Sequence, residues 1–144
     1  MEVKEKILSR ASELFILQGV KNVTMDNLAA DLKMSKRTLY ELYENKEALV
    51  METFKYMYLK ENKILKDIVR SSSNVIEALS AIINRKKEQF KSLNPMFIED
   101  LKKYFTTMQA FFHSGENRPK EHSIMYILLE KGMNEGIFRK DIRI

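Results

Sequence analysis

Residues 24–46 read TMDNLAADLKMSKRTLYELYENK, and the fold of the chain can be predicted outward from them. Thr24 is a suitable N-cap because its hydroxyl can accept a free N–H of a first helical turn, so a helix is predicted over 25–32. Ser35 offers a second N-cap, and the helix that it opens is predicted over 36–42. Two short helices joined by a tight turn therefore form the centre of the prediction.

Both predicted helices have an apolar face, which lets them pack against each other across the turn Lys33-Met34. The second helix would then present its N-terminal end, Ser35 to Thr38, outward. This is helix-turn-helix geometry, in which the first residues of a recognition helix meet base edges in the major groove of DNA. An ordinary helical hairpin with a solvated Lys-Arg pair fits the same pattern. The apolar faces consist of Met25, Leu28, Ala29, Leu32, Leu39, Leu42 and Tyr43.

Apolar spacing predicts helices along the rest of the chain. A first helix is predicted over 3–18, with Gly19 as its left-handed C-cap. A long helix, capped by Asn45 and free of glycine and proline, is predicted over 46–69. Further helices are predicted over 75–92, from Pro95 to about Phe112 and over 120–135, and a break near Thr106-Thr107 stays open.

Composition excludes several classes of protein. The 144 residues include no cysteine, so neither a disulfide framework nor a thiolate zinc site is available. No apolar run approaches the roughly 20 residues that span a bilayer, and no signal-peptide pattern is present, so we expect a soluble, cytoplasmic protein. The net charge of +5 is weak evidence for DNA binding, because residues 1–50 hold eight basic and eight acidic side chains. The informative cations are the local cluster Lys33, Lys36, Arg37 and Lys46.

No set of residues indicates an enzyme, a metal site or a cofactor site. His113 and His122 flank a predicted loop without metal-ligand spacing, so we expect them to be solvated. Glu99 and Asp100 are adjacent on a predicted helix and point about 100° apart, so they cannot flank one substrate atom. We expect this pair to lie at the surface. The four glycines are isolated, which argues against a phosphate-binding loop.

The first 50 residues resemble a known family. Residues 35–40 (SKRTLY), Tyr43 and residues 45–49 (NKEAL) are similar to the signature of TetR-type transcriptional repressors. The chain departs from the family pattern at Lys33, where a turn glycine is common, and a left-handed residue there would be strained by roughly 1 kcal/mol. It also departs at Leu42, where the family often has an aromatic residue or histidine that contacts phosphate. The first helix of the family is matched by Ile7, Leu8, Ala11, Leu14, Phe15 and Gly19.

The resemblance implies a helix-turn-helix DNA-binding domain over residues 1–46 and a helical regulatory domain over residues 47–144. The implied function is a DNA-binding transcriptional regulator: a repressor that binds a palindromic operator and is released by a small apolar or amphipathic effector. A helical adaptor that does not bind DNA is the alternative reading. The residues implied to face DNA bases, to hold phosphates or to lie against the DNA backbone are Thr24, Ser35, Lys36, Arg37, Thr38, Tyr40 and Lys46.

The resemblance also bears on the regulatory half. In TetR-type repressors the region after the DNA-binding module forms a ligand pocket, although each candidate lining residue could equally be ordinary core. The candidates here are Met57, Phe97, Leu101, Tyr104, Met108 and Met125.

The family usually continues beyond the point that matches Gly136 with two more helices, which pair into a four-helix dimer interface. This sequence stops at Ile144, so we expect a homodimer that is weaker than usual or joined through another surface. Apolar side chains that the two helices would cover should then be exposed. The expected positions are Ile124, Ile127, Leu128 and Phe138.

Overall fold

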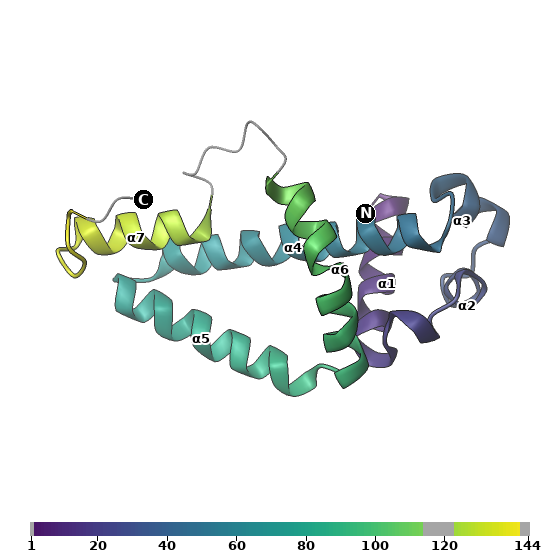
Figure 1. The fold of residues 1–144 in the computed structure, drawn as a ribbon, viewed down its shortest axis with the longest axis horizontal. Coiled ribbons are helices and arrows are strands. Elements are labelled where there is room, and N and C mark those ends of the chain that lie inside the picture. The colour runs from purple at the N-terminus through teal and green to yellow at the C-terminus, as the bar shows by residue number, and fades with distance from the viewer. Residues whose placement is uncertain (1, 114–122, 142–144) are drawn as a thin grey trace. The chain divides into compact units, whose positions relative to one another are not determined.

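The computed structural model describes residues 2–113 and 123–141, and within these ranges the chain is helical and contains no strand (Figure 1). The prediction of an all-α fold is therefore confirmed. None of the helices so described is long and apolar enough to cross a membrane. The elements in chain order are α1 (Val3–Gln18), the 3-10 helix η1 (Val20–Asn22), α2 (Met25–Asp31), α3 (Lys36–Leu42), α4 (Lys46–Ser71), α5 (Val75–Ser92), α6 (Pro95–His113) and α7 (Ile124–Asn134).

Side-chain caps set the start of three helices, as the sequence predicted. The Thr24 hydroxyl accepts the backbone N–H three residues further on at 3.1 Å, and the Ser35 hydroxyl does the same at 3.0 Å. The carboxamide oxygen of Asn45 accepts the equivalent N–H of α4 at 2.9 Å. Each cap satisfies one donor that the helix itself leaves free.

The extents of α6 and α7 can be compared with the predicted ones. α6 runs through Thr106-Thr107 to His113 without the break that the sequence left open. α7 is described from Ile124 to Asn134, and the predicted start near Lys120 lies outside the described residues.

The chain divides into two compact units. The first unit comprises Met1–Tyr58 and Leu93–Ser114, and the second comprises Leu59–Ser92 and Gly115–Ile144, so α4 contributes residues to both. The predicted domain boundary after residue 46 divides the chain by function and stays a prediction.

Buried aromatic rings form the centre of the first unit. Phe15, Phe54 and Phe97 are at most 1% exposed, and the rings of Phe54 and Phe97 stack with their centroids 5.9 Å apart. Burying a side chain of this kind contributes about 2–3 kcal/mol each. Because these rings come from α1, α4 and α6, their packing holds those three helices together around the helix-turn-helix segment.

The start of α6 is bonded to the end of α1. Asn94 reaches two carbonyl oxygens of α1, through its N–H at 3.3 Å and its carboxamide at 3.0 Å. The Asp100 carboxylate accepts the N–H of Val20 at 2.7 Å. Asp100 is therefore only partly exposed, because packing of α6 on α1 brings it onto a free donor of η1, whereas Glu99 is exposed as expected.

Gly19 makes this close approach possible. Its φ is 80° and its ψ is 151°, so the predicted left-handed C-cap is correct in the sign of φ but wrong in ψ. A Cβ atom at this position would lie 2.9 Å from the Cβ of Met96. Both the positive φ and the contact with α6 therefore require glycine here.

The second unit has its own small core between α4, α5 and α7. Val69, Val75 and Ala78 are buried there. Gly132 is also buried, and the Phe138 ring lies so close that a Cβ atom on residue 132 would be 2.1 Å from it. The expectation of exposed apolar side chains near the end of the sequence is wrong for Leu128, which is buried, and Ile124, Ile127 and Phe138 are partly buried against this core. The exposed apolar side chains of this unit include Ile76, Ile83 and Phe90 of α5 and Met125 of α7.

Candidate nucleic-acid interface

α2 and α3 lie side by side and are joined by a tight turn. The N–H of Met34 closes the turn on the carbonyl oxygen of Ala29 at 3.0 Å. Lys33 has a φ of 54°, so the residue that replaces a turn glycine is indeed left-handed. Leu39 of α3 is fully buried and belongs to the core of the first unit.

The face of α3 opposite Leu39 is exposed. Residue 37 is two positions from residue 39, a rotation of about 200° around the helix, so Arg37 points away from the core. Its side chain is 89% exposed, and Tyr40 beside it is also exposed. This face is the part of the motif that an incoming ligand could reach without rearrangement.

Lys36 is held at the edge of that face. Its ammonium lies 2.7 Å from the Asp26 carboxylate of α2 and 5.9 Å from the centre of the Tyr40 ring. The hydrogen bond with Asp26 raises the pKa of Lys36, so the side chain stays charged. The ion pair therefore links the first turn of α2 to the first turn of α3.

Ser35 and Thr38 are already used within the motif. The two hydroxyl oxygens are 2.7 Å apart, and the Ser35 hydroxyl also accepts the Thr38 N–H. Because both hydroxyls belong to the helix cap, their contact with a base would require a shared or exchanged hydrogen bond.

Lys46, at the start of α4, is bonded to the protein backbone. Its ammonium donates to the carbonyl oxygen of Val20 at 2.6 Å. Burial lowers the pKa of Lys46, and the nearby carboxylates of Asp100 and Glu47 offset only part of this effect. A second, longer bond of 3.4 Å reaches the carbonyl oxygen of Lys21, so one of the three ammonium donors is left for a phosphate.

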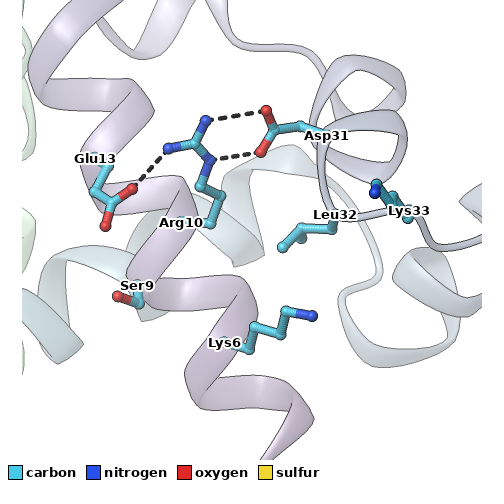
Figure 2. A pocket seen from close by; sticks show the side chains of 7 residues that line it. All are labelled: Lys6, Ser9, Arg10, Glu13, Asp31, Leu32 and Lys33. Atoms are coloured by element: carbon cyan, nitrogen blue, oxygen red, sulfur yellow. Dashed lines mark hydrogen bonds and ion pairs between the residues drawn. The ribbon is translucent and has the colours of Figure 1, made fainter.

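On another side of the motif, α1 is fastened to the end of α2 by an ion-pair cluster (Figure 2). Arg10 donates to both oxygens of Asp31, at 2.5 and 3.0 Å, and to Glu13 at 2.7 Å. The hydrogen bond from Arg10 lowers the pKa of Asp31. The cluster borders an open hollow of about 540 Å³, which is lined by Lys6, Ser9, Arg10, Glu13, Asp31, Leu32 and Lys33.

The predicted ligand-pocket residues are divided between the two units, and none of them lines that hollow. Phe97 and Tyr104 are buried in the core of the first unit, where Met57, Leu101 and Met108 pack against them in part. Met125 belongs to the second unit and is 61% exposed. The pocket stays a prediction.

Tyr104 connects α6 to the first turn of α4. Its hydroxyl donates to the Glu47 carboxylate at 3.1 Å, and burial together with this bond raises the pKa of Tyr104 to about 12. The hydroxyl therefore stays protonated at neutral pH and can donate to Glu47.

Among the described residues, no group of three or more His, Asp or Glu side chains is placed to hold a metal ion. The His113 side chain and the whole of His122 lie outside the described residues, so the expectation that they are solvated stays a prediction.

The helix-turn-helix segment matches a family profile. The profile is that of bacterial regulatory proteins of the tetR family, and it covers residues 7–53, from α1 into α4. Residues 7–53 therefore match the TetR family.

The relatives of this chain include regulators of Bacillus subtilis (strain 168). The uncharacterized HTH-type transcriptional regulator YvaF is 32% identical over 74% of this chain and 58% of its own length. The uncharacterized HTH-type transcriptional regulator YdeS is 28% identical over 96% of this chain and 68% of its own length. The chain thus spans little more than half of YvaF.

Two solved structures are also similar to this chain. The probable transcriptional regulatory protein RHA5900 aligns with a TM-score of 0.49 and 22% identity, over 97% of this chain and 76% of that chain. The ketosteroid transcriptional regulator KstR2 of Mycobacterium tuberculosis aligns with a TM-score of 0.45 and 24% identity, over 99% and 74%.

Two acidic residues of the motif were not among the predicted site residues. Asp26 pairs with Lys36, and Glu41 accepts from Arg37 at 2.9 Å. The second pair could have been found in the sequence, because residues 37 and 41 are four apart on one helix. The first pair depends on the angle at which α2 and α3 pack, so no local pattern indicates it.

Proposed function

We propose that this chain is a DNA-binding transcriptional regulator of the TetR family that reads the major groove with α3. The observation that supports this most directly is the exposed face of α3, where Arg37 and Tyr40 point away from the buried Leu39. An α-helix fits the major groove, and arginine can pair with the edge of a guanine there. The helix that presents this face lies inside the family match.

The proposed contacts with the DNA backbone come from the flanking elements. Thr24 caps the N-terminus of α2, and helix N-termini favour phosphate because their free N–H groups and the helix dipole attract anions. Tyr40 and Lys46 would hold phosphates on either side of the recognition helix. In this proposal Ser35, Lys36, Arg37 and Thr38 face the bases.

We further propose that two copies bind a palindromic operator as a homodimer. A single short recognition helix contacts few phosphates and bases, so it binds DNA only weakly at physiological salt. Two recognition helices about 34–36 Å apart on one face of the duplex would supply the missing affinity.

The regulatory part of the proposal is a repressor released by a small apolar or amphipathic effector. α4 supports this idea because it contributes residues to both units. Its first turn is bonded to η1 through Lys46 and to α6 through Glu47. An effector that binds one arrangement of these contacts more tightly than another would change DNA affinity, and DNA would change effector affinity by the same factor.

The test is selection of bound duplexes from a pool with a randomised centre, followed by titration of the enriched sequence by fluorescence anisotropy at several salt concentrations. We expect an enriched sequence with two-fold symmetry and an affinity that falls as salt rises, because phosphate contacts release counterions. If no sequence is enriched and any binding is independent of salt, the chain is not a DNA-binding regulator. A helical adaptor that does not bind DNA is then the better hypothesis.

A further inference from the structure

The two cations in the first turn of α3 have different partners. The ammonium of Lys36 lies on Asp26 of the neighbouring helix, so its charged end is already engaged. Arg37 instead donates through Nε to Oε1 of Glu41, one turn further along α3, at 2.9 Å. Its two terminal nitrogens have no hydrogen-bond partner among the described residues. The Nε atom of Arg37 is therefore bonded to the protein, whereas its two terminal nitrogens are available to a ligand.

The geometry of a guanidinium makes this arrangement useful. Its N–H donors form a rigid planar fork, so a bond at Nε fixes the plane of the group and the direction of the outer fork. The outer fork can donate two hydrogen bonds to O6 and N7 of guanine. A carboxylate at Nε thus orients the guanidinium without occupying the donors that would read the base.

Glu41 is the contact that orients Arg37. The Arg37 side chain is 89% exposed, so packing against the protein does little to restrict its rotatable bonds. An unrestrained arginine loses considerable side-chain entropy when it is fixed on a base. The pair with Glu41 removes part of that cost before DNA arrives.

We propose that Glu41 is a specificity-determining positioning residue: it directs Arg37 onto one guanine of the operator. This inference rests on the proposed function, since it requires α3 to enter the major groove. The Glu41 carboxylate has a second effect, because it also repels the phosphates of any sequence. Glu41 therefore raises the preference for guanine at one position while it lowers affinity for DNA in general.

The experiment measures base preference at every operator position by selection and sequencing of randomised duplexes. The variants are Glu41→Ala, Glu41→Gln, Arg37→Ala and the double variant. Glu44→Ala is the matched control, because Glu44 is also exposed, lies just beyond the end of α3 and has no bond to Arg37. Circular dichroism checks that each variant keeps the helical content of the natural chain.

We expect Arg37→Ala to abolish guanine preference at one position of each half-site. Glu41→Ala should reduce it at that same position by about 1.5- to 2.5-fold, the range expected for loss of an exposed pair on one helix. Glu41→Gln keeps an acceptor oxygen and should retain part of the preference. Both Glu41→Ala and Glu44→Ala should strengthen non-specific binding, but Glu44→Ala should leave base preference unchanged.

Three results would overturn the inference. The first is a Glu41→Ala variant with unchanged base preference. The second is a Glu41→Ala variant that loses preference at a position that Arg37→Ala leaves intact, or that loses as much preference in the Arg37→Ala background as in the natural chain. Either outcome would mean that Glu41 contacts a base itself, for example the cytosine amino group. The third is a natural chain that enriches no sequence, and this result removes the proposed function as well.

Discussion

The carboxylate of Glu61 is predicted to be the principal polar contact between α4 and α5, and Glu61→Gln tests this. The Glu61 carboxylate accepts two hydrogen bonds from Arg85, at 2.8 and 3.1 Å, one from Lys86 at 2.8 Å and one from Gln89 at 3.1 Å. Glutamine has nearly the same shape but no charge. The substitution therefore leaves Arg85 and Lys86 next to each other without their shared anion.

The magnitude follows from the pKa of Glu61. Burial opposes ionisation, but the hydrogen bonds from Arg85, Lys86 and Gln89 outweigh it and lower the pKa from its ordinary 4.5 to about 2. That difference corresponds to at most roughly 3 kcal/mol. The Glu61 side chain is 22% exposed and its two cationic partners more so, and solvent screening reduces the contribution to about 1–2 kcal/mol.

The contribution depends on pH in a defined direction. The folded pKa of Glu61 lies below the unfolded value, so its stabilisation is fully present above about pH 5 and is lost as the pH falls toward 2. The difference in unfolding free energy between the natural chain and Glu61→Gln should therefore be largest near pH 7. It should shrink steadily between pH 5 and pH 2.

Urea unfolding followed by circular dichroism at pH 7 and pH 3 measures both effects. Glu88→Gln is the matched control, because Glu88 lies on α5, is 68% exposed and, within the described part of the chain, bonds only to Lys91, three residues away. The control should change the unfolding free energy by less than about 0.5 kcal/mol. The reasoning is refuted if Glu61→Gln costs no more than the control, or if its cost is the same at both pH values.

Three further predictions concern the DNA-binding module. Tyr43→Phe should stabilise the chain by up to about 1 kcal/mol in urea unfolding, because the buried Tyr43 hydroxyl has no hydrogen-bond partner among the residues that the structure describes. A loss of more than about 1 kcal/mol would show that the hydroxyl is satisfied, for example by a buried water. Lys33→Gly should stabilise the chain by about 0.5–1 kcal/mol, because it relieves a left-handed lysine, whereas Lys33→Ala should not. In DNA titrations Arg37→Ala should cost about 1–3 kcal/mol on the enriched sequence and relax base preference, whereas Lys46→Ala should weaken all sequences alike; equal losses on specific and non-specific DNA in both variants would refute this division of roles.

Local chemistry was sufficient to predict most helices of this chain. The caps at Thr24, Ser35 and Asn45 were readable in the sequence because each cap bonds a backbone N–H only three residues away. The exposed position of Arg37 was readable for a similar reason, since helical geometry places it opposite Leu39. The left-handed Lys33 was indicated by the family resemblance, because a turn glycine is common at its position.

Contacts between helices that are far apart in sequence were decided by tertiary structure. Asp100 was expected at the surface, but it accepts the N–H of a residue 80 positions earlier. Apolar spacing shows that a helix has a buried face, but it does not specify the partner helix or the crossing angle. Which helices pack together, and at what angle, also decides that Lys46 bonds a backbone carbonyl and that Glu61 pairs with Arg85.

The exposure of apolar residues also depends on which helices pack together. Ile83 and Phe90 of α5 are apolar and exposed, whereas Ile127 and Leu128 of α7 are packed in the core of the second unit. Hydrophobicity alone ranks these side chains alike. The sequence therefore determined where the helices are and which face of α3 is exposed. The packing of α4, α5 and α7 determined which apolar side chains are covered, because burial depends on the neighbouring helix as well as on the residue itself.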